Sequence, residues 1–180
     1  KKAWENHFAN LLNDDDNDAY QELLEEGQNM DNCNDDETLA ELNSDINIAE
    51  VRKAISCAKL NKACGTDNLY AEVFKNNACI LIFHSFFNYC FVNITFPDKW
   101  QEGIISPVYK DGDKLDTNNY RGITLQNVSC KIYGDILNRR LVKWTELYNK
   151  VYDDQNGFRP ERSCEDHIYA LNSIVKMSLA

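Results

Sequence analysis

The stretch GIISPVYKDGDKLDTNNYRGITLQ, residues 103–126, decides the fold class of this 180-residue chain. Two runs rich in β-branched and apolar residues, 103–110 and 121–126, flank a polar segment of Asp, Asn and Gly. This pattern predicts an antiparallel β-hairpin with a long loop. Most other periodic segments have helical spacing, so the predicted fold class is α+β, mainly helical with one hairpin.

Two basic residues meet at the loop end of the predicted hairpin. Lys110 closes the first run and Arg121 opens the second, so strand pairing would place both cations together. Like charges repel unless an anion lies between them, and a guanidinium can bind phosphate through two parallel hydrogen bonds. Two interpretations stay open: a phosphate clamp, or pairing of each cation with a loop aspartate. The aspartates in reach are Asp111, Asp113 and Asp116.

Helical patterns precede the hairpin. Residues 47–60 predict a helix that begins with a capping box of Asn47 and Glu50, and residues 69–76 predict a short one. The apolar stretch near 78–93 predicts a buried helix, which we expect to end at Pro97.

Two further helices are predicted after the hairpin. Residues 128–148 carry a broad apolar face, and Arg140 falls inside it on a helical wheel. A buried arginine needs a carboxylate or a phosphate, and both options stay open. The last helix, about 163–178, begins with a second capping box of Ser163 and Asp166.

Charge is unevenly distributed along the chain. The net charge is −10, yet residues 1–50 hold 15 of the 29 acidic groups and only Lys1 and Lys2 as bases. The remaining residues hold 14 acidic and 17 basic groups, a net charge of +3, which permits a polyanionic partner. After a short helical pattern with Trp4 and Phe8, we interpret the front segment, 1–46, as an acidic linker.

Cysteine usage indicates a reducing compartment. The seven cysteines include no C-x-x-C pair, and none is spaced for zinc with the three histidines. With no signal peptide and no run of eighteen apolar residues, we expect an intracellular chain, nuclear or cytoplasmic, without a membrane span.

Five sequence blocks in order give the chain a specific signature from about residue 47 to its end. The chain resembles the front half of the reverse transcriptase of non-LTR (LINE-type) retrotransposons. That family carries K-A-P-G-x-D, P-x-x-W…P-[IV]-x-K-x-G-D, N-Y-R-G-I-T-L, K-[IV]…R-L and Q-x-G-F-R…R-S…D. The matching residues are Lys62, Ala63, Gly65, Asp67, Pro97, Trp100, Pro107, Val108, Lys110, Gly112, Asp113, Asn119 to Leu125, Lys131, Arg140, Leu141, Gln155, Gly157, Phe158, Arg159, Arg162, Ser163 and Asp166. Cys64 replaces the usual proline, and Asp111 stands where many relatives have a second lysine.

The resemblance implies a right-hand polymerase. It divides the chain into a pre-fingers linker (1–46), the fingers (47–149) and the start of an incomplete palm (150–180). The fingers hairpin of such enzymes closes on the incoming nucleotide. The nucleotide-binding residues it implies are Lys110, Arg121 and Gly122, and those expected to face template or primer are Lys62, Gln155 and Arg159.

Catalysis needs paired carboxylates that hold magnesium, and the family supplies them from F-x-D and Y-x-D-D segments. Neither occurs after the G-F-R block, where the family has them, and VYDDQ at 151–155 lies before that block and lacks the spacer residue. We therefore expect a piece of a longer protein that binds but does not polymerise, with Mg²⁺ belonging to the full-length enzyme. RNA template, DNA primer and deoxynucleoside triphosphate would be its partners. The alternatives are a non-catalytic RNA- or nucleotide-binding remnant and a helical interaction protein. In each case, missing palm strands would leave the apolar face of the last helix exposed.

Overall fold

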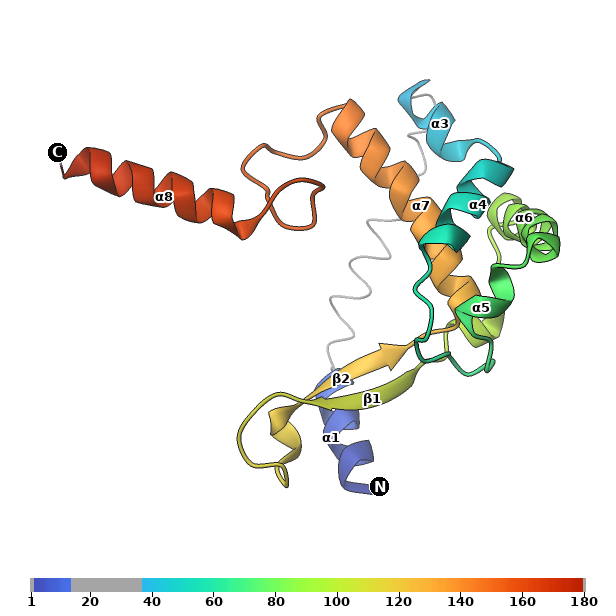
Figure 1. Ribbon diagram of the computed structural model, residues 1–180, viewed down its shortest axis with the longest axis horizontal. Helices are drawn as coiled ribbons and strands as arrows, with labels where there is room; N and C mark the ends of the chain where they lie inside the picture. Colours follow the sequence, from blue (N-terminus) through green and yellow to red (C-terminus); the bar gives the residue numbers. More distant parts are fainter. Residues whose placement is uncertain (1, 14–36, 180) are drawn as a thin grey trace. The chain divides into compact units, whose positions relative to one another are not determined.

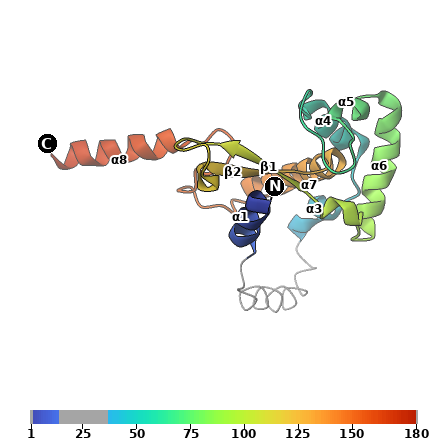
Figure 2. The ribbon, with the colours of Figure 1, turned by 90° about the horizontal axis from the view of Figure 1, so that it is seen from below.

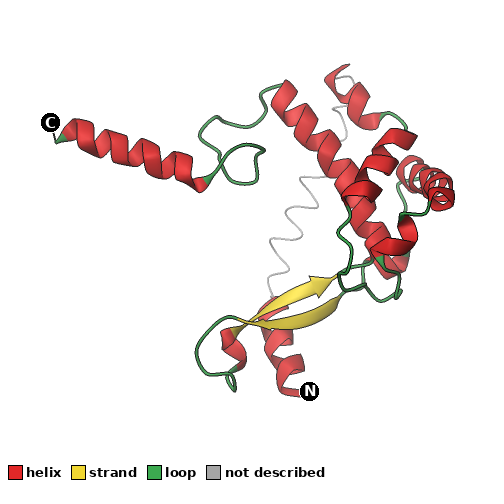
Figure 3. Cartoon of the chain, in the orientation of Figure 1, coloured by secondary structure: helices red, strands yellow, loops and turns green. Residues whose placement is uncertain are grey.

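The computed structural model describes residues 2–13 and 37–179, and it combines helices with one antiparallel hairpin (Figures 1 and 3). This arrangement confirms the α+β fold class. The elements are α1 (Lys2–Leu12), α3 (Ala40–Asn43), α4 (Ile48–Cys57), α5 (Ala71–Phe74), α6 (Asn77–Val92), β1 (Ile104–Tyr109), β2 (Tyr120–Leu125), α7 (Val128–Leu147) and α8 (Cys164–Ser178). Short 3-10 helices span Glu37–Leu39, Asp98–Trp100 and Thr117–Asn119. Most of the predicted acidic linker lies outside the described residues.

The chain divides into two compact units, Lys1–Ile136 and Leu137–Ala180, with the division inside α7. The functional division predicted after residues 46 and 149 stays a prediction. The first helix, which we had assigned to the linker segment, belongs to the same unit as the hairpin. Its spacing of Trp4 and Phe8 is therefore explained by packing within that unit.

The core of the first unit forms where α4, α5 and α6 surround the start of α7 (Figure 1). The predicted capping box begins α4: Asn47 Oδ1 accepts from the Glu50 N–H at 3.0 Å, and Glu50 Oε2 accepts from the Asn47 N–H at 2.8 Å. Capping both amides fixes the start of the helix and so the face that it buries. The buried core residues are Ile46, Val51, Ala54, Ile55, Ala71, Phe74, Ile80, Phe87, Val128, Ile132 and Ile136.

Helix α6 is less buried than its composition predicts. Ile80, Phe87 and Cys90 face the core, but Leu81, Ile82, Tyr89 and Val92 are exposed. The prediction of a buried helix was therefore wrong for half of its surface. The helix ends at Val92, within one residue of the predicted stretch 78–93. Asn93 caps this end and donates from Nδ2 to the Tyr89 carbonyl at 2.7 Å, so the helix stops before Pro97 is reached.

The second unit contains the end of α7, a loop and α8. Asp166 Oδ2 accepts from the Ser163 N–H at 2.8 Å and so begins α8 as predicted. None of the α8 residues is buried, and its apolar residues Ile168, Leu171, Ile174 and Val175 are exposed. The prediction of an exposed apolar face on this helix is confirmed.

Candidate functional site

The register of the hairpin fixes which side chains share a face. Val108 pairs with Arg121, Pro107 with Gly122, and Tyr109 with Tyr120. The Lys110 N–H donates to the Asn119 carbonyl at 2.8 Å, which continues the pairing by one residue beyond the strands. Because successive strand residues point to opposite faces, residues 104, 106, 108 and 110 share a face with 119, 121, 123 and 125.

Lys110 and Arg121 therefore lie on one face, as diagonal neighbours at the loop end of the hairpin. Diagonal neighbours in such a ladder are about 7–8 Å apart, within reach of two long side chains. Both residues are exposed. This face can receive an anion between an arginine fork and a lysine ammonium group.

The loop aspartates have other hydrogen-bond partners. Asp113 Oδ1 accepts from the Leu115 N–H at 2.9 Å, and Asp116 Oδ1 accepts from the Asn118 N–H at 2.9 Å. Within residues 2–13 and 37–179, no ion pair joins Lys110 or Arg121 to a carboxylate. The alternative in which loop aspartates neutralise the two cations is thus not the arrangement that the structure has.

Side chains from the strands order the loop itself. The Tyr109 hydroxyl donates to the Gly112 carbonyl at 2.7 Å, and the Tyr120 hydroxyl donates to the Lys114 carbonyl at 3.0 Å. Asn119 Nδ2 donates to the Asp113 carbonyl at 2.9 Å. Gly112 has a φ angle of +86°, which glycine adopts readily and in which any residue with a side chain would be strained. These bonds hold the end of the hairpin in a defined conformation around Lys110 and Arg121.

Gly122 lies on the opposite face from Arg121, where α1 contacts the hairpin. A Cβ atom at this position would lie 2.7 Å from Phe8 Cε1 and 3.1 Å from Ile105 Cγ2. The absence of a side chain thus makes room for an aromatic ring, which gives this glycine a packing role. A role for Gly122 in nucleotide binding stays a prediction.

Lys62 is exposed in the loop between α4 and α5. Asn127 fastens this loop beyond the end of β2: its Oδ1 accepts from the Thr66 hydroxyl and the Asp67 N–H, each at 3.3 Å. Lys62 is therefore near the base of the hairpin, whereas Lys110 and Arg121 are at its tip. Glu72 Oε1 also accepts from the Asn61 N–H at 2.7 Å, which lowers the pKa of the Glu72 carboxyl.

Arg159 has an internal partner. Its Nε and Nη2 donate to the two carboxylate oxygens of Glu146, each at 2.9 Å, and Nη1 donates to the Tyr152 carbonyl at 3.0 Å. Its side chain is only 12% exposed. The ion pair raises the pKa of Arg159 and lowers that of Glu146. The donors of Arg159 thus hold the loop after α7 in this structure, and a role for Arg159 in nucleic-acid binding stays a prediction.

Gln155 belongs to the same loop as Arg159. Its Nε2 donates to the Gly157 carbonyl at 3.1 Å, and the residue is exposed. Arg140, the other cation singled out above, is half-buried in α7 and has an interaction partner. Gln155 and Arg140 belong to the second unit, and the hairpin residues belong to the first.

Sequence reasoning missed Asn127, which is 2% exposed. Its Nδ2 donates to the Lys99 carbonyl at 3.0 Å, so one amide joins the loop of Lys62, the 3-10 helix before β1 and the start of α7. Its position two residues after the N-Y-R-G-I-T-L block was the available signal.

The structure suggests no further chemistry among the residues that it describes. No group of three His, Cys, Asp or Glu side chains is placed to hold a metal ion in those ranges. No described helix has the length and apolarity needed to cross a membrane. Comparison of the chain with models of protein families finds no match, and comparison with curated proteins finds none.

Proposed function

We propose that this chain is the nucleotide- and template-binding front part of an RNA-directed DNA polymerase of a non-LTR retrotransposon. The observation that carries the proposal is the pair Lys110 and Arg121, exposed on one face of an ordered hairpin and not neutralised by the loop aspartates. The five motif blocks support it independently. In this proposal, residues 47–149 supply the fingers and residues 150–180 begin the palm.

The two cations would bind the triphosphate of an incoming deoxynucleotide. Arg121 offers a planar fork for two phosphate oxygens, and Lys110 offers a point charge beside it. Contacts of this kind give affinity without base choice, as a polymerase that accepts four nucleotides requires. Lys62, Gln155 and Arg159 are the residues proposed to contact the RNA template or DNA primer, and Arg159 would have to leave Glu146 to do so. Mg²⁺ would accompany the triphosphate, and its carboxylate ligands would come from palm segments absent from this sequence.

The test is triphosphate binding by the unaltered chain and by Arg121→Gln, measured by fluorescence anisotropy with a labelled deoxynucleoside triphosphate and Mg²⁺. Loss of charge-assisted hydrogen bonds is expected to weaken binding about 10- to 100-fold. Lys110→Gln should weaken binding less, because a single ammonium group is lost.

Lys114→Gln is the matched control. Lys114 is in the same loop, but its Nζ lies 5.7 Å from the centre of the Tyr109 ring, and Tyr109 belongs to the opposite face. This variant removes the same charge as Lys110→Gln and is expected to bind the triphosphate within about twofold of the unaltered chain, since exposed charges are strongly screened. Equal losses in Arg121→Gln and Lys114→Gln would show only a general charge effect and contradict the clamp.

A non-catalytic nucleotide-binding module would give the same binding result. The reading frame beyond codon 180 distinguishes the two functions. If the proposal holds, the frame continues into an F-x-D segment and then Y-x-D-D. The longer protein should then extend a primer on an RNA template. A frame that lacks these aspartates would leave only the binding module.

A further inference from the structure

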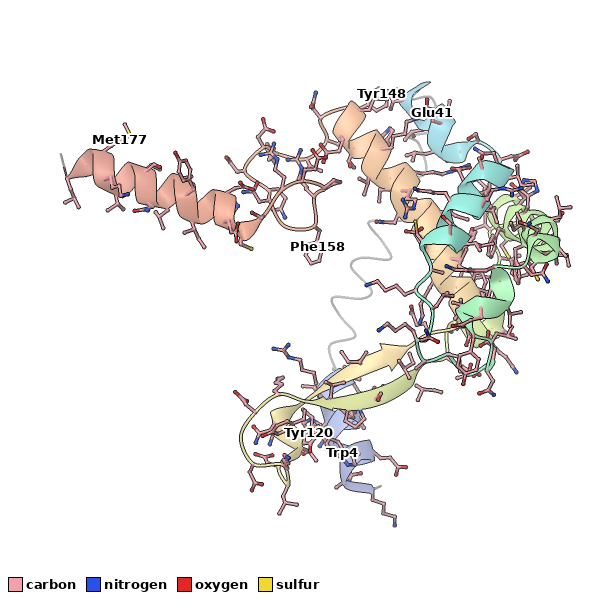
Figure 4. The ribbon with its side chains drawn as sticks, viewed as in Figure 1. Trp4, Glu41, Tyr120, Tyr148, Phe158 and Met177 are labelled. Carbon is pink, nitrogen blue, oxygen red and sulfur yellow. The ribbon has the colours of Figure 1, made fainter. Side chains whose placement is uncertain are left out.

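Helix α1 contacts the hairpin on the face opposite Lys110 and Arg121 (Figures 1 and 2). The Trp4 ring meets the Tyr120 ring edge to face, with centroids 4.7 Å apart. Figure 4 shows the two residues close together where α1 meets the hairpin. Phe8 is 7% exposed, and it lies against the Gly122 backbone. An isolated two-stranded hairpin is marginally stable in water, so a helix on one face contributes to its order.

The two contacts flank Arg121 in the sequence. Tyr120 and Gly122 are its chain neighbours. Both belong to the face of the hairpin that α1 contacts, whereas Arg121 belongs to the opposite face. Trp4 contacts the residue before the arginine and Phe8 the residue after it. Holding both neighbours fixes the backbone from which the guanidinium projects.

The contact of Trp4 continues into the loop. Tyr120 lies 5.4 Å from Tyr109, centroid to centroid, and the hydroxyls of these two residues bind the carbonyls of Lys114 and Gly112. Trp4 therefore supports the tyrosine pair that orders the loop after Lys110.

We propose that α1 is the support that positions the phosphate clamp, with Trp4 and Phe8 as positioning residues that touch no ligand. This inference rests on the proposed function, because it concerns the same hairpin. It also assigns a role to the front of the chain, which the sequence patterns indicate only as a helix leading into a linker.

The experiment uses the full chain with Phe8→Ala and Trp4→Ala, and Leu11→Ala as the matched control, since Leu11 is on the same helix and 64% exposed. Amide hydrogen exchange, measured without nucleotide, reports hairpin order. Faster exchange is expected at Val108, Arg121 and Ile123 in the two aromatic variants, with core amides of α7 unchanged. Triphosphate binding should weaken about tenfold if the competent hairpin falls to a tenth of the population. Leu11→Ala should match the unaltered chain in both measurements.

A second pair of variants tests the specific contact. Gly122→Ala places a methyl group against the Phe8 ring and is expected to accelerate hairpin exchange. In the double variant Phe8→Ala/Gly122→Ala the ring is gone, so exchange should be no faster than in Phe8→Ala alone. Trp4→Phe, which keeps an aromatic ring against Tyr120, should restore slow exchange relative to Trp4→Ala.

The outcomes separate this inference from the proposed function. Unchanged hairpin exchange in Phe8→Ala and Trp4→Ala would overturn the support by α1, whatever the nucleotide result. Additive effects of Phe8→Ala and Gly122→Ala would also overturn it, because they would show no direct contact. Absence of triphosphate binding by the unaltered chain, with the expected exchange pattern, would overturn the proposed function and leave the structural support of the hairpin established.

Discussion

The side-chain amide of Asn88 forms hydrogen bonds with both the N–H and the carbonyl group of Ile46. Its Oδ1 accepts from the Ile46 N–H at 2.7 Å, and its Nδ2 donates to the Ile46 carbonyl at 2.7 Å. Ile46 is 1% exposed and comes just before α4, so its backbone groups have little access to water. A side chain of α6 thus supplies the hydrogen-bond partners that these two backbone groups would otherwise find in a helix or a sheet.

Asn88→Ala should therefore destabilise the first unit. Leaving a buried N–H without its acceptor costs about 1–3 kcal/mol, although the His84 ring nitrogen still lies 2.9 Å from the Ile46 carbonyl oxygen. Urea denaturation measures the change in the free energy of unfolding. Ser85→Ala, on the exposed side of the same helix, is the control and should stay within about 0.5 kcal/mol of the unaltered chain.

Replacement of two glycines by alanine should change the free energy of unfolding in opposite directions. At Gly65 a methyl group would overlap Asn127, with the Cα atom of Asn127 2.7 Å away, so we expect a loss of about 1–3 kcal/mol. At Gly134, inside α7, nothing lies within 4 Å of the added atom, and alanine should stabilise the helix by about 0.5–1 kcal/mol. Thermal unfolding of both variants checks the pair. A stabilised Gly65→Ala would contradict the docking of the Lys62 loop on Asn127.

Cysteine accessibility tests the core of the first unit. Cys90 is 2% exposed, and burial raises the pKa of its thiol, whereas Cys57 and Cys164 are exposed. Alkylation by iodoacetamide near neutral pH should therefore modify Cys57 and Cys164 first and leave Cys90 unmodified until the chain unfolds. Peptide mapping by mass spectrometry gives the order. Early modification of Cys90 would contradict the packing of α6.

Acid should loosen the loop after α7. The hydrogen bonds from Arg159 hold the pKa of Glu146 below its ordinary value, so this carboxylate binds fewer protons in the folded state than in the unfolded state. The stability it contributes is present above the ordinary glutamate pKa and is lost as the pH falls through the lowered folded value. Limited proteolysis by pepsin across the acid range should show cleavage near residues 151–163 increasing as pH falls. Glu146→Gln should be cleaved there at every pH, with a weaker pH dependence.

The apolar face of α8 should limit solubility. Leu171 and Ile174 are 65% and 64% exposed, and Figure 4 shows Met177 projecting from the same helix. Exposed apolar patches of this kind promote association. Leu171→Lys/Ile174→Lys should raise the concentration at which the chain stays monomeric in sedimentation, with an unchanged melting temperature. A drop in melting temperature would mean that this face is covered in solution.

Local patterns in the sequence predicted the hairpin, the capping box of α4 and most helices, because each depends on residues a few positions apart. Contacts between distant residues were not predictable in this way. Asn88 and Ile46 are 42 positions apart, and Asn127 and Thr66 are 61 apart. Lys110 and Arg121 were found because the hairpin itself brings them together. The sequence also did not indicate that Glu146, 13 positions before Arg159, would bind its guanidinium group.

Because of Pro107, the outer edges of β1 and β2 differ in the backbone N–H groups that they offer to a further strand. It occupies a position of β1 whose backbone groups point outward, and proline has no N–H to offer there. The outer edge of β2 keeps the outward N–H groups of Gly122 and Thr124. A further strand that paired along β1 would therefore leave one of its acceptors without a donor opposite Pro107, whereas pairing along β2 would not have this cost.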